Sequence, residues 1–62
     1  MTLKQAENHI GRKVVYKPFL GCDMDDWEYG VITSVNSKYV FVRYGSAVSA
    51  KATDPNDLEL EV

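Results

Sequence analysis

The carboxylates between positions 23 and 28 are the densest group of side chains in the sequence that could bind a metal ion. The group consists of Asp23, Asp25, Asp26 and Glu28. Carboxylate oxygens are the ligands that Ca²⁺ prefers, but a calcium loop also needs an oxygen ligand at the position of Trp27 and a glycine in its middle. This stretch offers neither. We therefore expect a solvated acidic loop and no metal site.

Histidine and cysteine each occur once, as His9 and Cys22. A zinc site needs several nitrogen or sulfur ligands at short spacings, such as CxxC or HExxH, and neither pattern is present. The sequence also has no glycine-rich phosphate loop and no arrangement of serine or cysteine with histidine that is typical of nucleophilic catalysis. We predict that the chain is not an enzyme and uses no metal or other cofactor.

The aromatic residues beside the acidic loop are candidates for an interface with another protein. Trp27 ends a polar, glycine-containing loop, so its burial is less assured than that of rings within apolar strands. Tryptophan and tyrosine are common at interface centres, and neighbouring carboxylates would steer a basic partner. The predicted protein-binding residues are Trp27, Tyr29, Asp23, Asp25, Asp26 and Glu28. A second aromatic cluster is expected from Phe19, Phe41 and Tyr44, unless these rings fill the core.

The basic residues suggest an alternative function, the binding of nucleic acid. Lysine and arginine would contact phosphates while bases stack on Tyr39 and Phe41. The principal candidates are Lys17, Lys38, Tyr39 and Arg43, with Arg12, Lys13 and Lys51 on the same expected face. The net charge of -2 counts against a general attraction to phosphate backbones.

Residues 27–45 hold the densest run of β-branched and aromatic residues, and they predict a hairpin around which the other elements are arranged. Its strands are expected at Glu28–Val35 and Lys38–Tyr44. They would be joined by a two-residue turn at positions 36–37 or by a three-residue loop through Lys38. Gly30, inside the first strand, indicates a bulge, a bend or a close approach of another backbone segment.

Shorter elements flank the hairpin. A capping box that starts at Thr2 predicts a helix from Leu3 to His9, whose apolar stripe of Leu3, Ala6 and Ile10 would plug one end of a barrel. The other expected elements are a strand at Lys13–Phe19, loops at Leu20–Asp26 and Ser46–Ser49, a strand at Ala50–Thr53, a helical turn at Asp54–Asp57 and a strand at Leu58–Val62.

The chain of 62 residues is expected to form a single domain, 1–62, with one small core. Side chains alternate between the faces of a strand, and helix residues recur at helical spacing. These two patterns predict a core of Ile10, Val14, Tyr16, Ile32, Val35, Val40, Val42, Leu58 and Leu60. A lone cysteine, with no cationic leader and no long apolar run, places the chain in a reducing cytoplasm and away from membranes.

From about residue 10 to residue 61, the sequence resembles the SH3-like small β-barrel of the Tudor or KOW variety. The matching segments are Gly11–Tyr16, Tyr29–Val35, Val40–Gly45 and Asp57–Leu60. The resemblance implies an all-β fold, namely a five-stranded barrel with a short N-terminal helix and a helical turn before the last strand. The sequence is also similar to short proteins encoded in bacteriophage and prophage genomes, which implies an accessory protein that acts in the host cytoplasm.

Tudor domains hold methylated lysine or arginine in a cage of aromatic side chains, through cation–π attraction. The resemblance implies walls of such a cage at Phe19, Trp27, Tyr29, Phe41 and Tyr44. Three roles therefore remain open: a module that binds a protein, for example a host protein; a module that binds nucleic acid; and a structural protein that forms homo-oligomers through open sheet edges.

Overall fold

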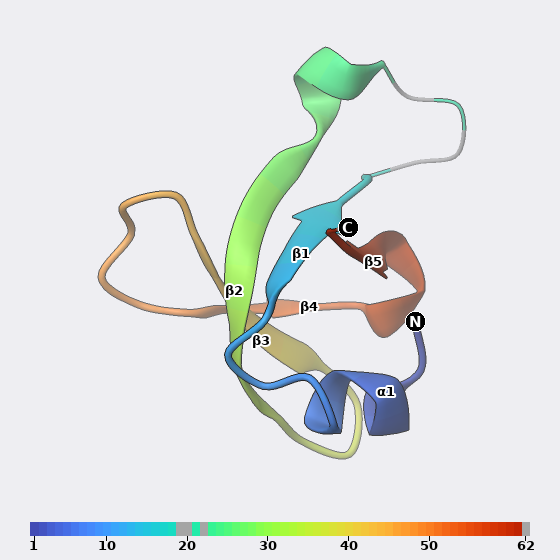
Figure 1. The fold of residues 1–62 in the computed structure, drawn as a ribbon, viewed down its shortest axis with the longest axis vertical. Helices are drawn as coiled ribbons and strands as arrows, with labels where there is room; N and C mark the ends of the chain where they lie inside the picture. The colour runs from blue at the N-terminus through green and yellow to red at the C-terminus, as the bar shows by residue number, and fades with distance from the viewer. Residues whose placement is uncertain (19–20, 22, 62) are drawn as a thin grey trace.

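A single antiparallel sheet of five strands dominates the computed structural model, which describes residues 1–18, 21 and 23–61 (Figure 1). The strands are β1 (Lys13–Tyr16), β2 (Glu28–Val35), β3 (Val40–Tyr44), β4 (Lys51–Thr53) and β5 (Leu58–Leu60). They pair in the order β4-β3-β2-β1-β5, so β4 and β5 are edges and the pairings of the described residues do not close the sheet. The prediction of a mostly β domain with five strands is confirmed.

The N-terminal helix α1 (Leu3–Glu7) begins with the predicted capping box. The Thr2 hydroxyl accepts a hydrogen bond from the backbone amide of Gln5 at 3.1 Å, and the side-chain oxygen of Gln5 accepts one from the backbone amide of Thr2 at 2.9 Å. The helix ends earlier than predicted, with Asn8 as its C-cap. Ile10 therefore leaves the helical stripe and is 50% exposed, so the prediction that it belongs to the core is wrong.

The hairpin of β2 and β3 forms as predicted, but its connection is longer than either expected turn, because it spans residues 36–39. The side-chain oxygen of Asn36 accepts bonds from the amides of Lys38 and Tyr39, at 2.8 and 2.6 Å. The Asn36 amide in turn donates to the Tyr39 carbonyl at 3.0 Å. These hydrogen bonds pair backbone amides of the four-residue loop within the loop itself. Strand β3 therefore starts only at Val40.

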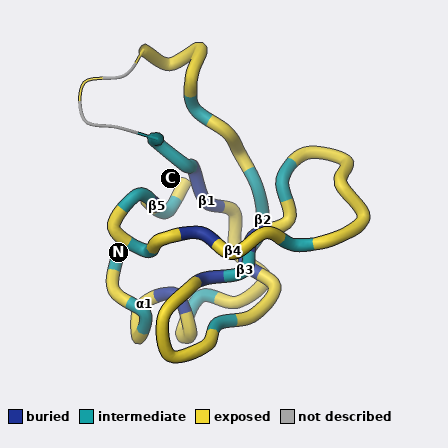
Figure 2. The backbone as a smooth tube through the Cα atoms, turned by 180° about the vertical axis from the view of Figure 1, so that it is seen from behind, coloured by how far each residue is buried: buried dark blue, intermediate teal, exposed yellow. Residues whose placement is uncertain are grey.

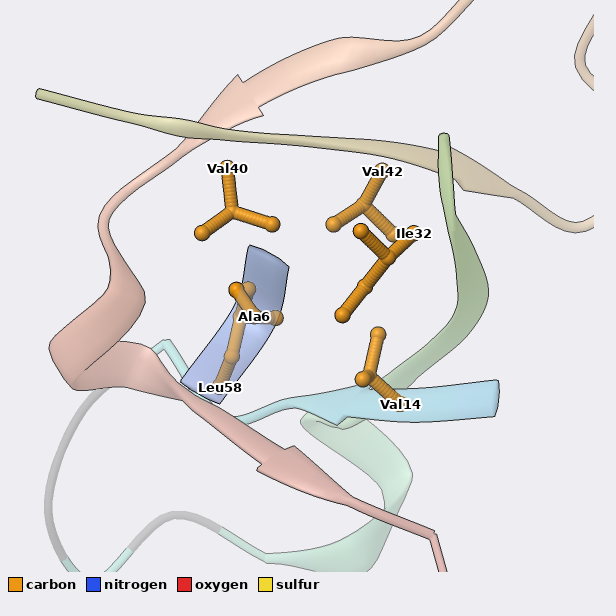
Figure 3. Packing of buried hydrophobic residues seen from close by; sticks show 6 residues of the cluster. All are labelled: Ala6, Val14, Ile32, Val40, Val42 and Leu58. Atoms are coloured by element: carbon orange, nitrogen blue, oxygen red, sulfur yellow. The ribbon is translucent and has the colours of Figure 1, made fainter. Parts of the chain in front are cut away.

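The core lies on one face of the sheet, where α1 contributes Ala6 (Figure 3). The buried cluster consists of Ala6, Val14, Ile32, Val40, Val42 and Leu58. Five of these are predicted core residues, and three more, Tyr16, Val35 and Leu60, are partly buried against the cluster. Alternation along the strands therefore predicts the core well, except at the helix end.

The other face of the sheet, which we call the outer face, also buries a side chain, that of Val15, which is 6% exposed. Val15 pairs with Tyr29 on β2 and with Glu59 on β5. Residues directly opposite each other on neighbouring strands place their side chains on the same face. Because β1 has a neighbour on both sides, side chains from two strands flank Val15.

Two short 3₁₀ turns complete the described chain. The turn η1 (Met24–Asp26) lies within the predicted loop, and η2 (Pro55–Asp57) is the predicted helical turn, capped by an Asp54 oxygen that accepts from the Asn56 amide at 2.9 Å. Strand β1 ends at Tyr16, before its predicted end. The predictions for Phe19, Leu20, Cys22 and Val62 lie outside the described residues. In the part of the chain that is described, no helix is both long and apolar enough to cross a membrane.

Candidate functional site

The predicted protein-binding residues fall on three different surfaces. Asp23, Asp25 and Asp26 are exposed on η1 and the residue before it, and we call residues 23–26 the acidic turn. Tyr29 pairs with Val15 on the outer face, whereas the preceding Glu28 pairs with Tyr16 on the core side of the sheet. Side-chain alternation along β2 therefore separates Glu28 from Tyr29.

A hollow of about 360 Å³ opens on the core side, and it combines aromatic and acidic side chains from several elements. We call it the tyrosine hollow. It is lined by Tyr16, Glu28, Tyr44, Lys51, Ala52, Thr53, Asp54 and Asp57. Of these residues, Glu28 and Tyr44 belong to the predicted protein-binding and aromatic sites, and Lys51 to the alternative nucleic-acid face. The register of β1 with β2 adds Tyr16, the pairing of β4 with β3 adds Lys51, Ala52 and Thr53, and η2 with its N-cap adds Asp54 and Asp57.

The two tyrosine rings of this hollow are held by packing and by one side-chain hydrogen bond. Their centroids are 6.0 Å apart and their planes are inclined by 63°, an edge-to-face arrangement. The hydroxyl groups of Tyr44 and Thr53 are hydrogen-bonded at 2.8 Å, and Thr53 is 7% exposed. The Tyr44 ring is therefore fixed between the core and the hollow.

Negative charge dominates the tyrosine hollow, which contains three carboxylates and one ammonium group. Burial raises the pKa of the Tyr44 hydroxyl, the hydrogen bond with Thr53 opposes this shift, and the nearby charges of Glu28 and Asp57 raise the pKa further. A neighbouring negative charge disfavours the tyrosinate anion and favours a cation for the same reason. The hollow is therefore suited chemically to a positively charged group.

Trp27 lies beside a cation of its own chain. The Lys17 ammonium is 4.3 Å from the centre of the indole ring and also forms an ion pair with Glu59. The hydrogen bond from Lys17 holds the pKa of the Glu59 carboxyl below its ordinary value. Trp27 is half-buried, and its Nε1 is buried with no hydrogen-bond partner among the described residues. Lys17 thus already occupies part of the surface that the indole would offer to a ligand.

The residues of the alternative nucleic-acid face are not gathered in one place. Lys17 is engaged with Glu59, while Lys38 and Tyr39 lie in the loop between β2 and β3. Arg43 is exposed on β3, and Phe41, two residues earlier, is half-buried. The Tyr39 side chain is 44% exposed. Of the second aromatic cluster, Tyr44 alone lines the tyrosine hollow, and Phe19 lies outside the described residues.

A second hollow, of about 350 Å³, lies on the outer face, and we call it the outer-face hollow. It is lined by Lys13, Tyr29, Gly30, Val31, Arg43, Gly45 and Glu61. Lys13 and Arg43 both pair with Val31, from opposite sides, so the two cations flank one apolar residue. Tyr29, which is 47% exposed, is the aromatic wall of this hollow.

No group of three or more histidine, cysteine, aspartate or glutamate side chains is placed to hold a metal ion among the residues that the structure describes. Comparison of the chain with protein-family models, with curated proteins and with solved structures finds no match. The two hollows are therefore the candidate binding sites of the described chain.

Proposed function

We propose that the chain is a small, non-catalytic binding module whose tyrosine hollow receives a basic side chain of a partner protein. The observation that carries the proposal is the lining of this hollow, where three carboxylates and two tyrosine rings surround one concavity. Aromatic rings attract cations through their electron-rich faces, and carboxylates accept the hydrogen bonds that a lysine or arginine donates. Concave sites with a few convergent polar groups are the usual form of a binding site.

The proposed contact keeps the aromatic and acidic character that the sequence indicates. Glu28 and Tyr44 are retained from the predicted sites, Tyr16 is added, and Trp27 and Tyr29 no longer form the centre of the contact. Lys51 is the one cation in the lining, and it would compete with an incoming basic group for the carboxylates. Lys51 is exposed and forms no ion pair among the described residues, so its ammonium group would oppose an incoming cation mainly by charge repulsion.

We further propose an SH3-like fold for the chain and a phage or prophage origin. The strand order β4-β3-β2-β1-β5, with a helical turn before β5, supports an SH3-like arrangement in which each strand of the meander pairs with its neighbour and β5 returns to β1. We propose this arrangement as a barrel-like SH3 variant. A phage or prophage source and a host protein as partner, in the host cytoplasm, rest on the resemblance of the sequence alone.

Binding of short basic peptides, measured by fluorescence anisotropy, tests the proposal. We expect an arginine- or lysine-containing peptide to bind, and Glu28→Gln to weaken the binding by about 5-fold or more, because one hydrogen bond to a charged group is worth about 1.5–3 kcal/mol before solvent screening. Lys51→Gln should strengthen the binding. Both variants change exposed residues, so the fold should persist.

Asp25→Asn is the matched control, because it removes the same charge from the acidic turn, outside the hollow. If Glu28→Gln and Asp25→Asn weaken peptide binding equally, the loss of binding follows from the change in net charge alone. That result would contradict the proposed site. A single-stranded oligonucleotide tests the alternative function in the same assay. Tight, steeply salt-dependent binding that Lys38→Gln and Arg43→Gln weaken would favour nucleic acid as the ligand.

A further inference from the structure

The outer-face hollow has two cations and one carboxylate, whereas the charged side chains of the acidic turn are all carboxylates, and neither surface takes part in an ion pair within the described chain. Among the described residues the one ion pair joins Lys17 to Glu59. Lys13 and Arg43 are both exposed, as are Asp23, Asp25 and Asp26. Exposed cations and exposed carboxylates therefore remain available on two separate surfaces of one molecule.

The shape of the outer-face hollow suits a compact, partly apolar ligand. Adjacent strands are about 4.8 Å apart, so Lys13 and Arg43 rise from backbones roughly 10 Å apart, with Val31 between them. The half-exposed Tyr29 ring adds apolar surface. Glu61 also lines the hollow and repels any anion beside it, so an acidic ligand must place its carboxylates next to Lys13 and Arg43 and away from Glu61.

The acidic turn has the complementary composition. Its three aspartates neighbour Met24 in the sequence, and Met24 is 67% exposed. Figure 1 shows η1 as the teal-green coil next to the start of β2, away from the other strands. The exposed Met24 side chain and the exposed carboxylates beside it can therefore contact a second molecule.

We propose that the acidic turn of one copy of this chain docks into the outer-face hollow of a second copy. The aspartates would contact Lys13 and Arg43, and Met24 would cover Val31 and Tyr29. Turn and hollow are different surfaces, so the contact is head-to-tail and each added copy leaves a free turn and a free hollow. The tyrosine hollow, on the core side of β2, takes no part, so this proposal is independent of the proposed function.

Such an interface is small, so the self-association should be weak and salt-dependent. Stable interfaces bury about 1,200–2,000 Å² in total, with about 20–30 residues on each side, and the four residues of one turn in one hollow bury a smaller area. We expect sedimentation velocity to show larger species as the concentration of the native protein approaches about 1 mM, the range of a weak complex. Raising the salt concentration should return the protein to monomer, because the contact depends on exposed charges.

Two complementary variants test the geometry. The double variant Lys13→Glu/Arg43→Glu keeps the acidic turn but reverses the charge of the hollow, and Asp25→Asn/Asp26→Asn keeps the hollow but weakens the turn. Each variant alone should remain monomeric. An equimolar mixture should form a 1:1 complex and nothing larger, since only one functional turn and one functional hollow can meet.

Lys4→Glu/Lys38→Glu is the control, because it makes the same change of net charge at exposed positions outside the hollow. This control should self-associate like the native chain. The proposal is overturned if the native protein stays monomeric at every concentration, if the control loses association as completely as the hollow variant, or if mixing the two test variants restores no complex. Binding of an oligonucleotide by a monomeric native protein, lost in Lys13→Glu/Arg43→Glu, would assign the hollow to phosphate instead.

Discussion

At the scale of single residues, the Tyr44 hydroxyl links the end of β3 to β4. It shares a hydrogen bond of 2.8 Å with Thr53, a residue that is 7% exposed. The ring meanwhile packs against the core and meets Tyr16 edge-on. One side chain therefore supports the hydrophobic cluster and shapes the tyrosine hollow.

The raised pKa of Tyr44 predicts a loss of stability in alkali. Its ordinary value is 10.0, and burial is the main cause of the increase in the folded state. Above pH 10 the unfolded chain loses this proton more readily than the folded chain does, so the free energy of unfolding falls as the pH rises through the raised pKa. This contribution is fully present below pH 10. Chemical denaturation at a series of pH values measures it.

Tyr44→Phe separates this effect from other alkaline titrations. The variant should lose about 1 kcal/mol at neutral pH, because one hydrogen bond is removed while the ring remains. Its free energy of unfolding should fall less steeply than that of the parent above pH 10. Parallel curves for the two proteins across this range would show that Tyr44 does not cause the alkaline decline.

The residues of the tyrosine hollow could be predicted from the sequence only in part. Alternation along a strand is visible in the sequence, and it already implies that Glu28 faces away from Trp27 and Tyr29. The sequence does not reveal the register that places Tyr16 opposite Glu28, or the position of η2, which adds Asp57. The aromatic and acidic character of the site could therefore be predicted from the sequence, but the set of residues that lines the tyrosine hollow could not.

At the scale of elements, Gly30 allows β2 and β3 to approach closely. A Cβ atom at this position would lie 2.7 Å from the Arg43 carbonyl oxygen and 2.7 Å from a methyl group of Val42. The close approach is one of the three reasons that the sequence offered for this glycine. The irregularity of register between Ile32 and Ser34 lies elsewhere along β2.

Gly30→Ala should destabilise the sheet by about 1–3 kcal/mol, because inserted atoms in packed surroundings force neighbours apart and here one neighbour is backbone. For a domain of this size, each 1 kcal/mol lowers the melting temperature by roughly 4–8 °C. Thermal denaturation followed by circular dichroism measures the change. Gly45→Asn is the control: φ is +53° at this glycine, nothing lies within 4 Å of the added atom, and asparagine tolerates this conformation. A control as damaging as Gly30→Ala would exclude the steric explanation.

Element positions were more predictable than element ends. The strand Glu28–Val35 agrees with its prediction because β-branched and aromatic residues fill it. The predicted strand at Lys13–Phe19 is shorter in the structure, since β1 ends at Tyr16 and the next amide, that of Lys17, bonds to the Asp57 carbonyl at 2.9 Å. Ends of this kind depend on contacts distant in sequence, which local propensity does not report.

At the scale of the whole molecule, a small core leaves little reserve of stability. The buried cluster has six members, and Figure 2 shows how much of the remaining backbone is exposed or half-buried. A domain of this length gains only about 3–5 kcal/mol from such a core. The two faces of the sheet should therefore respond very differently to the same substitution.

Valine-to-aspartate substitutions on opposite faces of the sheet test this expectation. Val42 is fully buried in the core, whereas Val31 is half-buried on the outer face, between Lys13 and Arg43. Val42→Asp buries a carboxylate without a partner, which costs several kcal/mol and should unfold the domain. Val31→Asp places its carboxylate between two cations and should leave the fold intact. Circular dichroism and the dispersion of amide NMR signals distinguish the outcomes. A folded Val42→Asp variant would show that this face of β3 does not form the core.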